Sequence, residues 1–199
     1  MKMAEVYLIS DTHFGQRFVI EFSNRPFKNV KEMQIKLMDN WNGEVSKKDL
    51  VIIVGDFYAG NEIFSKYLIN NLNGDKILIK GNHDYKYRYK KLLETKDIKV
   101  YRKIEFSVYN HQFILTHKPL KYIPKQAFNI HGHLHRKLLS SKYDQSKYYN
   151  VAVEHNLYKP IPFEKILEDK LGTNNVNQDT IIKQIKYSDI NKQNRLLEQ

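Results

Sequence analysis

Short apolar runs recur through the first half of the chain, and each is followed by a stretch with helical spacing. The runs over residues 6–9, 50–54 and 76–80 are continuous rather than alternating, which is typical of strands covered on both faces. Between them, residues 30–45 predict an amphipathic helix, broken near Asn42-Gly43, and residues 63–72 predict a second. With a further helix expected over 87–95, the alternation of strand and helix predicts a parallel sheet.

The second half of the chain has a different pattern, with short strands and little helix between them. Strands are expected over residues 100–109, 112–116, 128–131, 148–153 and 158–159. This spacing indicates an antiparallel continuation, and so an α/β fold with a two-layered, mixed parallel and antiparallel β-sheet core flanked by helices. Residues 14–29 are expected to form a loop, and 162–171 a last helix with Pro162 in its first turn.

Length and composition favour one globular unit of ordinary kind. The chain has 199 residues, of which 41% are hydrophobic, and we assign 1–171 to a single domain. Residues 172–199 are more polar and predict either a tail or a weak amphipathic helix. No apolar run reaches the roughly 18 residues of a membrane span, and the N-terminus lacks a signal-peptide pattern. The absence of cysteine excludes disulfides and thiolate metal sites and favours a reducing compartment, the cytoplasm.

The chain is strongly basic, with a formal net charge of +11. Such a charge attracts polyanions and makes nucleic acid a candidate partner, although a lysine-rich composition alone would also account for it. Residues 85–91 interleave tyrosine with lysine and arginine. This run could stack on bases and pair with phosphates, or it could form the solvated face of a helix.

Polar residues of one chemical kind follow the apolar runs. Asp11 and His13 are two positions apart, as are His133 and His135, and residues i and i+2 of an extended segment point the same way. Nitrogen and oxygen donors without sulfur suit Mn²⁺, Fe, Co, Ni or Zn²⁺ better than Ca²⁺. The donors are too many for one ion and about right for two: Asp11, His13, Asp56, Asn82, His117, His133 and His135.

In chain order these residues read DxH, GD, GNHD, H and GHxH, which resembles the calcineurin-like metallophosphoesterases, and in particular small stand-alone bacterial or phage-type members. The resemblance covers residues 4–165. It implies two divalent metal ions, for which Mn²⁺ is our first choice. By the resemblance, Asp11, His13 and His135 hold the first ion, while Asn82, His117 and His133 hold the second. Asp56 stands where the family's carboxylate bridges both.

The resemblance also implies hydrolysis of a phosphate ester by a metal-bridging hydroxide. His83 matches the family's histidine that is not a ligand and would assist the leaving group, and Asp84 could orient its ring. Arg17 and Arg25 lie close enough in sequence to the first motif to contact a substrate phosphate. The remaining histidines, His111, His131 and His155, are expected to be structural, as is the segment 150–155.

The sequence therefore predicts a metal-dependent phosphoesterase, more specifically a phosphodiesterase. Its partner would be a phosphate-ester substrate, possibly a nucleotide or nucleic acid, and no membrane. Two alternatives stay open at this point: a nucleic-acid-processing nuclease, and a non-catalytic metal-binding scaffold of the same fold. Nothing in the sequence indicates an oligomeric state.

Overall fold

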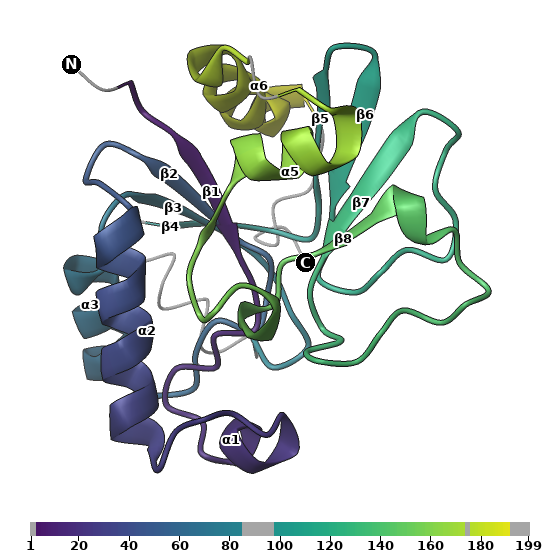
Figure 1. Ribbon diagram of the computed structural model, residues 1–199. Coiled ribbons are helices and arrows are strands. Elements are labelled where there is room, and N and C mark those ends of the chain that lie inside the picture. Colours follow the sequence, from purple (N-terminus) through teal and green to yellow (C-terminus); the bar gives the residue numbers. More distant parts are fainter. Residues whose placement is uncertain (1–2, 85–97, 174–175, 192–199) are drawn as a thin grey trace.

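The computed structural model describes residues 3–84, 98–173 and 176–191. In these ranges the chain forms two β-sheets that pack face to face, with helices around them (Figure 1). The α/β class with a two-layered core is therefore confirmed. The helix predicted over 87–95 lies outside the described residues.

The first sheet has the strand order β4-β3-β2-β1-β9. Its parallel part is formed by β1 (Val6–Ile9), β2 (Leu50–Ile53), β3 (Asp75–Ile79) and β4 (Ile98–Tyr101). The short edge strand β9 (Ile161–Pro162) pairs with β1 in the antiparallel direction. The parallel sheet predicted from the alternation of strands and helices is confirmed.

The second sheet has the order β5-β6-β7-β8, with bounds Ile104–Val108, His111–Leu115, Ala127–His131 and Tyr148–Asn150. Only β5 and β6 are antiparallel, because a tight turn joins them. The pairs β6–β7 and β7–β8 are parallel, so the prediction of an antiparallel continuation was wrong for them. Parallel neighbours need long connections, and here loops that carry histidines take the place of helices.

Three further strand predictions need correction. The strand predicted over 100–109 is two strands in different sheets, since β4 ends at Tyr101 and β5 begins at Ile104. The strand predicted over 158–159 does not form, because Leu157 and Tyr158 have left-handed backbone, with φ of 51° and 61°. The strand expected to reach residue 153 ends at Asn150, and a 3₁₀-helix follows over Val153–His155.

The helices lie on both sides of the sheets (Figure 1). Asn caps begin α2 (Val30–Glu44) and α3 (Glu62–Asn71), where the side chains of Asn29 and Asn61 accept backbone N–H groups. α2 continues through Asn42-Gly43, where a break was predicted. α1 (Phe18–Phe22) lies inside the stretch that was expected to be a loop.

The last two helices follow the second sheet in sequence. α5 (Phe163–Leu171) begins directly after Pro162, which makes no side-chain cap hydrogen bond, and ends at Gly172 in the left-handed region. α6 (Gln178–Asn191) lies in the stretch for which the sequence left a tail and a weak helix open, and it buries Ile181 and Ile185. Among the described residues, no helix is long and apolar enough to span a membrane.

The core explains why the first strands are continuously apolar. In β1, Tyr7 and Ile9 pack with α2 and α3 in one cluster, while Val6 and Leu8 pack with the second sheet, α5 and α6 in another. Successive side chains of a strand point to opposite faces, so each face of this sheet meets an apolar layer. The first sheet is thus packed on both faces, and the ends of its strands are held in place.

Candidate metal centre

The predicted motifs meet at one place in the fold. They follow the carboxyl ends of β1, β2 and β3 in the first sheet and of β6 and β7 in the second. The carboxyl ends of strands are the usual ligand side of an open α/β sheet. Both sheets therefore contribute to a single site, and residues more than a hundred positions apart become neighbours.

Left-handed backbone, rather than extended alternation, makes these side chains converge. Among the predicted ligands, φ is positive at Asp11 (58°), His13 (49°), Asp56 (52°), His133 (68°) and His135 (49°). The reason given from sequence, that residues i and i+2 of an extended segment share a face, was wrong. Asp11 and His13 do meet in one donor group, but His133 and His135 belong to different groups. Such backbone costs on the order of 1–3 kcal/mol per residue and collects at functional sites.

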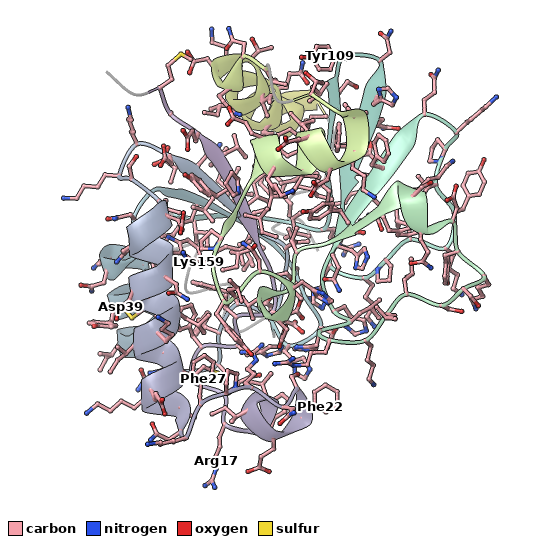
Figure 2. The ribbon with its side chains drawn as sticks, viewed as in Figure 1. Arg17, Phe22, Phe27, Asp39, Tyr109 and Lys159 are labelled. Atoms are coloured by element: carbon pink, nitrogen blue, oxygen red, sulfur yellow. The ribbon has the colours of Figure 1, made fainter. Side chains whose placement is uncertain are left out.

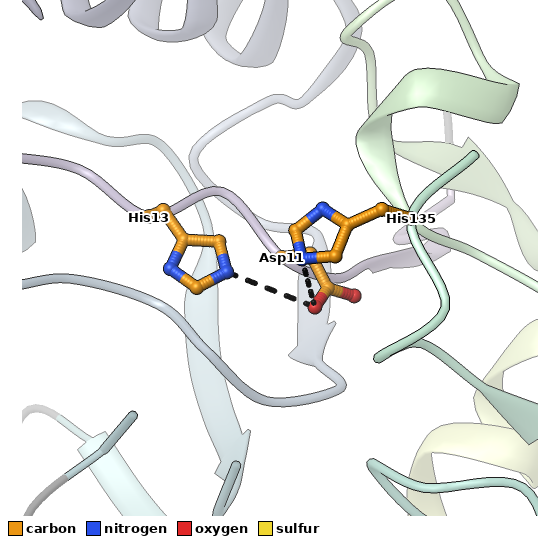
Figure 3. A group of neighbouring side chains, drawn as sticks. All are labelled: Asp11, His13 and His135. Atoms are coloured by element: carbon orange, nitrogen blue, oxygen red, sulfur yellow. Dashed lines mark ion pairs between the residues drawn. The ribbon is translucent and has the colours of Figure 1, made fainter. Parts of the chain in front are cut away.

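The first group of ligand atoms consists of Asp11, His13 and His135 (Figure 3). Asp11 Oδ1 lies 3.9 Å from His13 Nε2 and 3.6 Å from His135 Nε2. The two imidazole rings stack at a centroid distance of 5.2 Å. Three donor atoms thus face a common point, as the sequence predicted for the first ion.

The second group consists of Asp56, His117 and His133. Asp56 Oδ2 lies 3.3 Å from His117 Nε2 in its own group and 3.6 Å from His13 Nε2 in the first. Asn82 Oδ1 lies 3.0 Å from His117 Nε2, so the amide also reaches this group. One carboxylate oxygen therefore stands between the two groups.

Three of the histidines are oriented by a contact to Nδ1, the ring nitrogen that does not face the carboxylates. Nδ1 contacts Gln16 Oε1 in His13, the Val54 carbonyl at 2.9 Å in His117, and Glu154 Oε1 at 2.9 Å in His135. An acceptor at Nδ1 fixes the tautomer that leaves the Nε2 lone pair bare. In each case Nε2 is the atom that faces the carboxylates.

In each of the two aspartates, one carboxylate oxygen accepts hydrogen bonds from the protein and the other is turned to the donor groups. Asp11 Oδ2 accepts the backbone N–H of His133 at 2.8 Å and the hydroxyl of Ser10 at 2.6 Å. Asp56 Oδ1 accepts the backbone N–H of His83 at 2.7 Å. In both residues one oxygen positions the backbone, and the other faces the centre.

The electrostatics of the site favour a cation. Burial raises the pKa of Asp11. Burial also lowers the pKa of His117, but its hydrogen bond to Asp56 and the charges of Asp11 and Asp56 raise it overall to about 9. Among the described residues, neither aspartate pairs with lysine or arginine. Two buried carboxylates thus draw a proton onto His117, and a metal ion would supply that positive charge instead.

Two buried polar atoms without hydrogen-bond partners indicate whether a metal ion fits the site. Asp11 Oδ1 and His13 Nε2 are both fully covered, and neither has a hydrogen-bond partner among the described residues. An unsatisfied buried polar atom is costly, and here both atoms belong to the first group of ligands. Carboxylate oxygen and imidazole nitrogen suit first-row divalent metals. The residues present therefore fit divalent ions in both groups.

A glycine precedes each of three ligands, at positions where side chains from other strands come too close to leave room for a Cβ atom. A Cβ at Gly55 would lie 2.3 Å from His117 Nδ1, and one at Gly81 would lie 2.1 Å from Asp56 Oδ1. At Gly132 it would lie 1.9 Å from Ser10 Oγ and 2.2 Å from Asp11 Oδ2. The glycines of the GD, GN and GH motifs thus make room for the side chains of other strands.

We therefore expect Gly132→Ala to lower the affinity for Mn²⁺ and the melting temperature, since the added methyl group must displace Ser10 and Asp11. Overpacking of this kind typically costs about 1–3 kcal/mol. Gly43→Ala in α2 is the matched control, because its Cβ would meet nothing within 4 Å and alanine favours helix. Calorimetric titration and thermal unfolding measure both effects, and unchanged metal affinity in Gly132→Ala would contradict this account of the glycine.

The other predicted residues have different surroundings from those expected. The Asp84 carboxylate accepts backbone N–H groups from Asp56, Phe57 and Gly81 at 2.8–3.0 Å, so it braces two strand ends rather than orienting His83. Burial raises the pKa of Asp84 to about 6, against the effect of those N–H groups.

Neither predicted substrate arginine is placed beside the metal ligands as a free cation. Arg25 is buried, with Nη2 2.7 Å from Glu154 Oε1 and 2.6 Å from the Asp11 carbonyl. The prediction that Arg25 contacts substrate is therefore corrected, because its guanidinium is committed to the protein. Arg17 is exposed and projects outward from α1 (Figure 2).

The structure adds Glu154 to the site, which sequence reasoning missed. Its Oε1 joins Arg25 to His135, and burial, which raises its pKa, is outweighed by His135 and Arg25, so that the pKa falls to about 2. The signal was present as an acidic residue near the end of the domain, in a segment expected to be only structural. In that segment, His155 contacts the His135 carbonyl through Nε2. His131, at the end of β7, is buried, and its Nδ1 contacts the Gly132 carbonyl. Both contacts are with the backbone, as expected of structural histidines.

Two facing groups of oxygen and nitrogen donors, at the strand ends of a two-layered α/β core, define a protein built to hold divalent cations. The family model of the calcineurin-like phosphoesterases matches residues 4–193, and the chain belongs to this family. Family membership makes it a phosphoesterase, and the two donor groups support a metal-dependent one.

Relatives extend the likeness without naming a substrate. An uncharacterized protein of Methanocaldococcus jannaschii, MJ1445, is 37% identical over 175 residues, which cover 84% of this chain and 92% of that protein. The crystal structure of AQ665, a protein of unknown function from Aquifex aeolicus, is 28% identical with a TM-score of 0.67, covering 82% of this chain and 98% of that one. YfcE, a phosphoesterase from E. coli, is 14% identical over 74% of this chain and 78% of its own, at a TM-score of 0.39 that is too low to support comparison.

Proposed function

We propose that the protein is a binuclear phosphodiesterase that uses two divalent ions, Mn²⁺ first among them. The observation that carries this proposal is the position of Asp56 Oδ2, 3.6 Å from a ligand atom of the first group and 3.3 Å from one of the second. A carboxylate oxygen shared in this way suits two neighbouring ions better than two separate sites.

Each of the seven ligands is assigned to one ion or to both. Asp11, His13 and His135 would hold one ion, Asn82, His117 and His133 the other, and Asp56 both. When bound, a pair of divalent ions neutralises phosphoryl charge and makes a nucleophile available from water at neutral pH. Gln16, Val54 and Glu154 keep three of the imidazoles oriented, so that the donor geometry exists before the ions arrive.

His83 is the proposed general acid. Its ring lies at the edge of the first group, with a centroid distance of 5.3 Å to His13 and 5.6 Å to Phe18. Its side chain is only partly buried, and its backbone N–H is fixed by Asp56 at 2.7 Å. A histidine in this position can give a proton to the leaving oxygen of an ester bound between the two groups.

A diester is the favoured substrate because of charge. A monoester dianion carries more negative charge than a diester, and added cations commonly meet that charge. Arg25 is instead committed to Glu154, and the exposed Arg17 projects outward from the start of α1 (Figure 2). The surroundings of both arginines support a singly charged phosphate.

We expect His83→Ala to keep both ions and to lose roughly 10²–10⁴-fold in turnover, the usual contribution of general acid–base catalysis. His111→Ala is the control, since His111 lies at the start of β6, the end away from His117, with its ring tilted against that of Phe128. Its turnover should stay near that of the wild type. Metal content by atomic spectroscopy accompanies the rate measurement. Loss of metal from His83→Ala would show that this residue is a ligand and would end its assignment as the acid.

The nuclease and the scaffold remain alternatives with distinct outcomes. The run 85–91 that favours a nuclease lies outside the described residues, so its support is still the sequence and the net charge of +11. A steep dependence of oligonucleotide binding on salt would favour the nuclease. Stoichiometric metal binding without hydrolysis of any ester would favour the scaffold.

A further inference from the structure

α1 is a short helix beside the metal centre, and its role does not follow from the metal ligands. It is anchored by Val19, which is fully buried in the core cluster that also holds Met33 of α2. Arg136, directly after the GHxH motif, donates from Nε to the Ser23 carbonyl at the end of α1, at 2.8 Å. These contacts hold α1 against the core and against the segment that carries His135.

The exposed side of α1 presents two phenylalanines one helical turn apart. Phe18 is 48% exposed and Phe22 is 62% exposed, and residues i and i+4 lie on the same helix face. A single exposed apolar side chain is ordinary. A pair of large rings on one face of a short anchored helix, beside a charged site, calls for a specific explanation.

Both rings contact the candidate catalytic and metal-binding histidines. The Phe18 centroid lies 5.9 Å from that of His13 and 5.6 Å from that of His83. The Phe22 centroid lies 5.8 Å from that of His135, at an interplanar angle of 80°. The helix therefore forms one wall of the metal centre, and this wall is aromatic and open to solvent.

A cation completes this wall. Lys137 follows the GHxH motif, and its Nζ lies 5.4 Å from the centroid of the Phe22 ring. Aromatic faces combined with lysine or arginine are the usual platform for nucleic-acid bases, which stack on the rings while cations meet the phosphates.

We propose that Phe18 and Phe22 form an aromatic shelf that stacks on the nucleobase of a nucleotide ester whose phosphate occupies the metal centre. This inference rests on the proposed function and narrows its substrate to nucleotides. The shelf acts in binding, and it leaves the chemistry to the metal ligands and His83. Base stacking is commonly worth about 1–3 kcal/mol per base, or roughly 5- to 150-fold in affinity.

The test compares two phosphates that differ only by the base. AMP and ribose 5-phosphate are titrated calorimetrically into the Mn²⁺-loaded full chain. AMP should bind at least about fivefold more tightly, and Phe22→Ala should abolish most of that advantage while leaving ribose 5-phosphate unchanged. Phe22→Trp should retain it, since a larger ring also stacks. Tyr109→Ala is the aromatic control, because Tyr109 is 57% exposed at the far end of the molecule (Figure 2).

Equal binding of AMP and ribose 5-phosphate to the wild type would overturn the shelf, as would a Phe22→Ala variant that weakens both ligands alike. Failure of both ligands to bind would overturn it too. Hydrolysis of methyl p-nitrophenyl phosphate by the same preparation separates this result from the proposed function. If that diester is hydrolysed, only the shelf fails, and if it is not, the proposed function fails with it.

Discussion

Asp56→Asn is expected to abolish hydrolysis, with a loss of roughly a thousandfold or more, because metal ions contribute several kcal/mol of charge stabilisation. The substitution removes a negative charge that both donor groups share. It also places either an amide N–H or a neutral oxygen opposite His13 Nε2 and His117 Nε2, which lie 3.6 Å and 3.3 Å from Asp56 Oδ2. Since Asn can still accept the His83 N–H through its amide oxygen, the backbone should change little.

The measurement combines Mn²⁺ stoichiometry with the rate of diester hydrolysis. Asp49→Asn is a matched control, since Asp49 is also buried and accepts backbone N–H groups, from Glu5 and Ser46, but lies at the opposite end of β2. That variant is expected to lose stability but to keep its metal and its rate per folded molecule. An Asp56→Asn protein that binds two equivalents of Mn²⁺ and retains a tenth of the activity would contradict the bridging role.

Glu154→Gln is expected to weaken metal binding by about 10–100-fold, which is the usual effect of losing an outer partner of a ligating histidine. Glu154 Oε1 accepts from His135 Nδ1 at 2.9 Å and from Arg25 Nη2 at 2.7 Å. The neutral amide leaves the buried guanidinium of Arg25 without its counter-charge. Breaking a buried ion pair on one side costs about 3–5 kcal/mol, so the metal-free protein should also be less stable.

Chemical denaturation in the presence of a chelator isolates the loss of stability from the loss of metal. Glu44→Gln provides the control, because Glu44 pairs with Lys159 at 2.7 Å near the surface, and exposed pairs are worth about 0–1 kcal/mol. If Glu154→Gln matched the control in both stability and metal affinity, the buried chain Arg25–Glu154–His135 would not support the centre.

The residues of the two donor groups could be singled out because short motifs at strand ends carry them. The apolar runs located β1, β2 and β3, and the resemblance of the motif order to the family implied the division into two groups that the structure brings together. Glu154 was missed because its partners, Arg25 and His135, are 129 and 19 residues away. A buried ion pair between distant residues has no local sequence pattern.

Backbone geometry was the other part that sequence reasoning could not reach. Asp11, His13 and Asp56 adopt left-handed conformations that these residue types disfavour on their own. They are held by long-range hydrogen bonds, such as the Asp11 N–H to the Gly55 carbonyl and the His13 N–H to the Asp56 carbonyl. The break between β4 and β5 likewise depends on which sheet each strand joins, rather than on local propensity.

The central claim is that two ions held around Asp56 hydrolyse a phosphodiester, and it is tested most directly by titrating metal-free protein with Mn²⁺ while following hydrolysis of methyl p-nitrophenyl phosphate. The account predicts that activity requires both ions, rising steeply as the second equivalent binds, and that a chelator abolishes it. Full occupancy by two ions with no hydrolysis of this diester, or equal activity in metal-free protein, would contradict it.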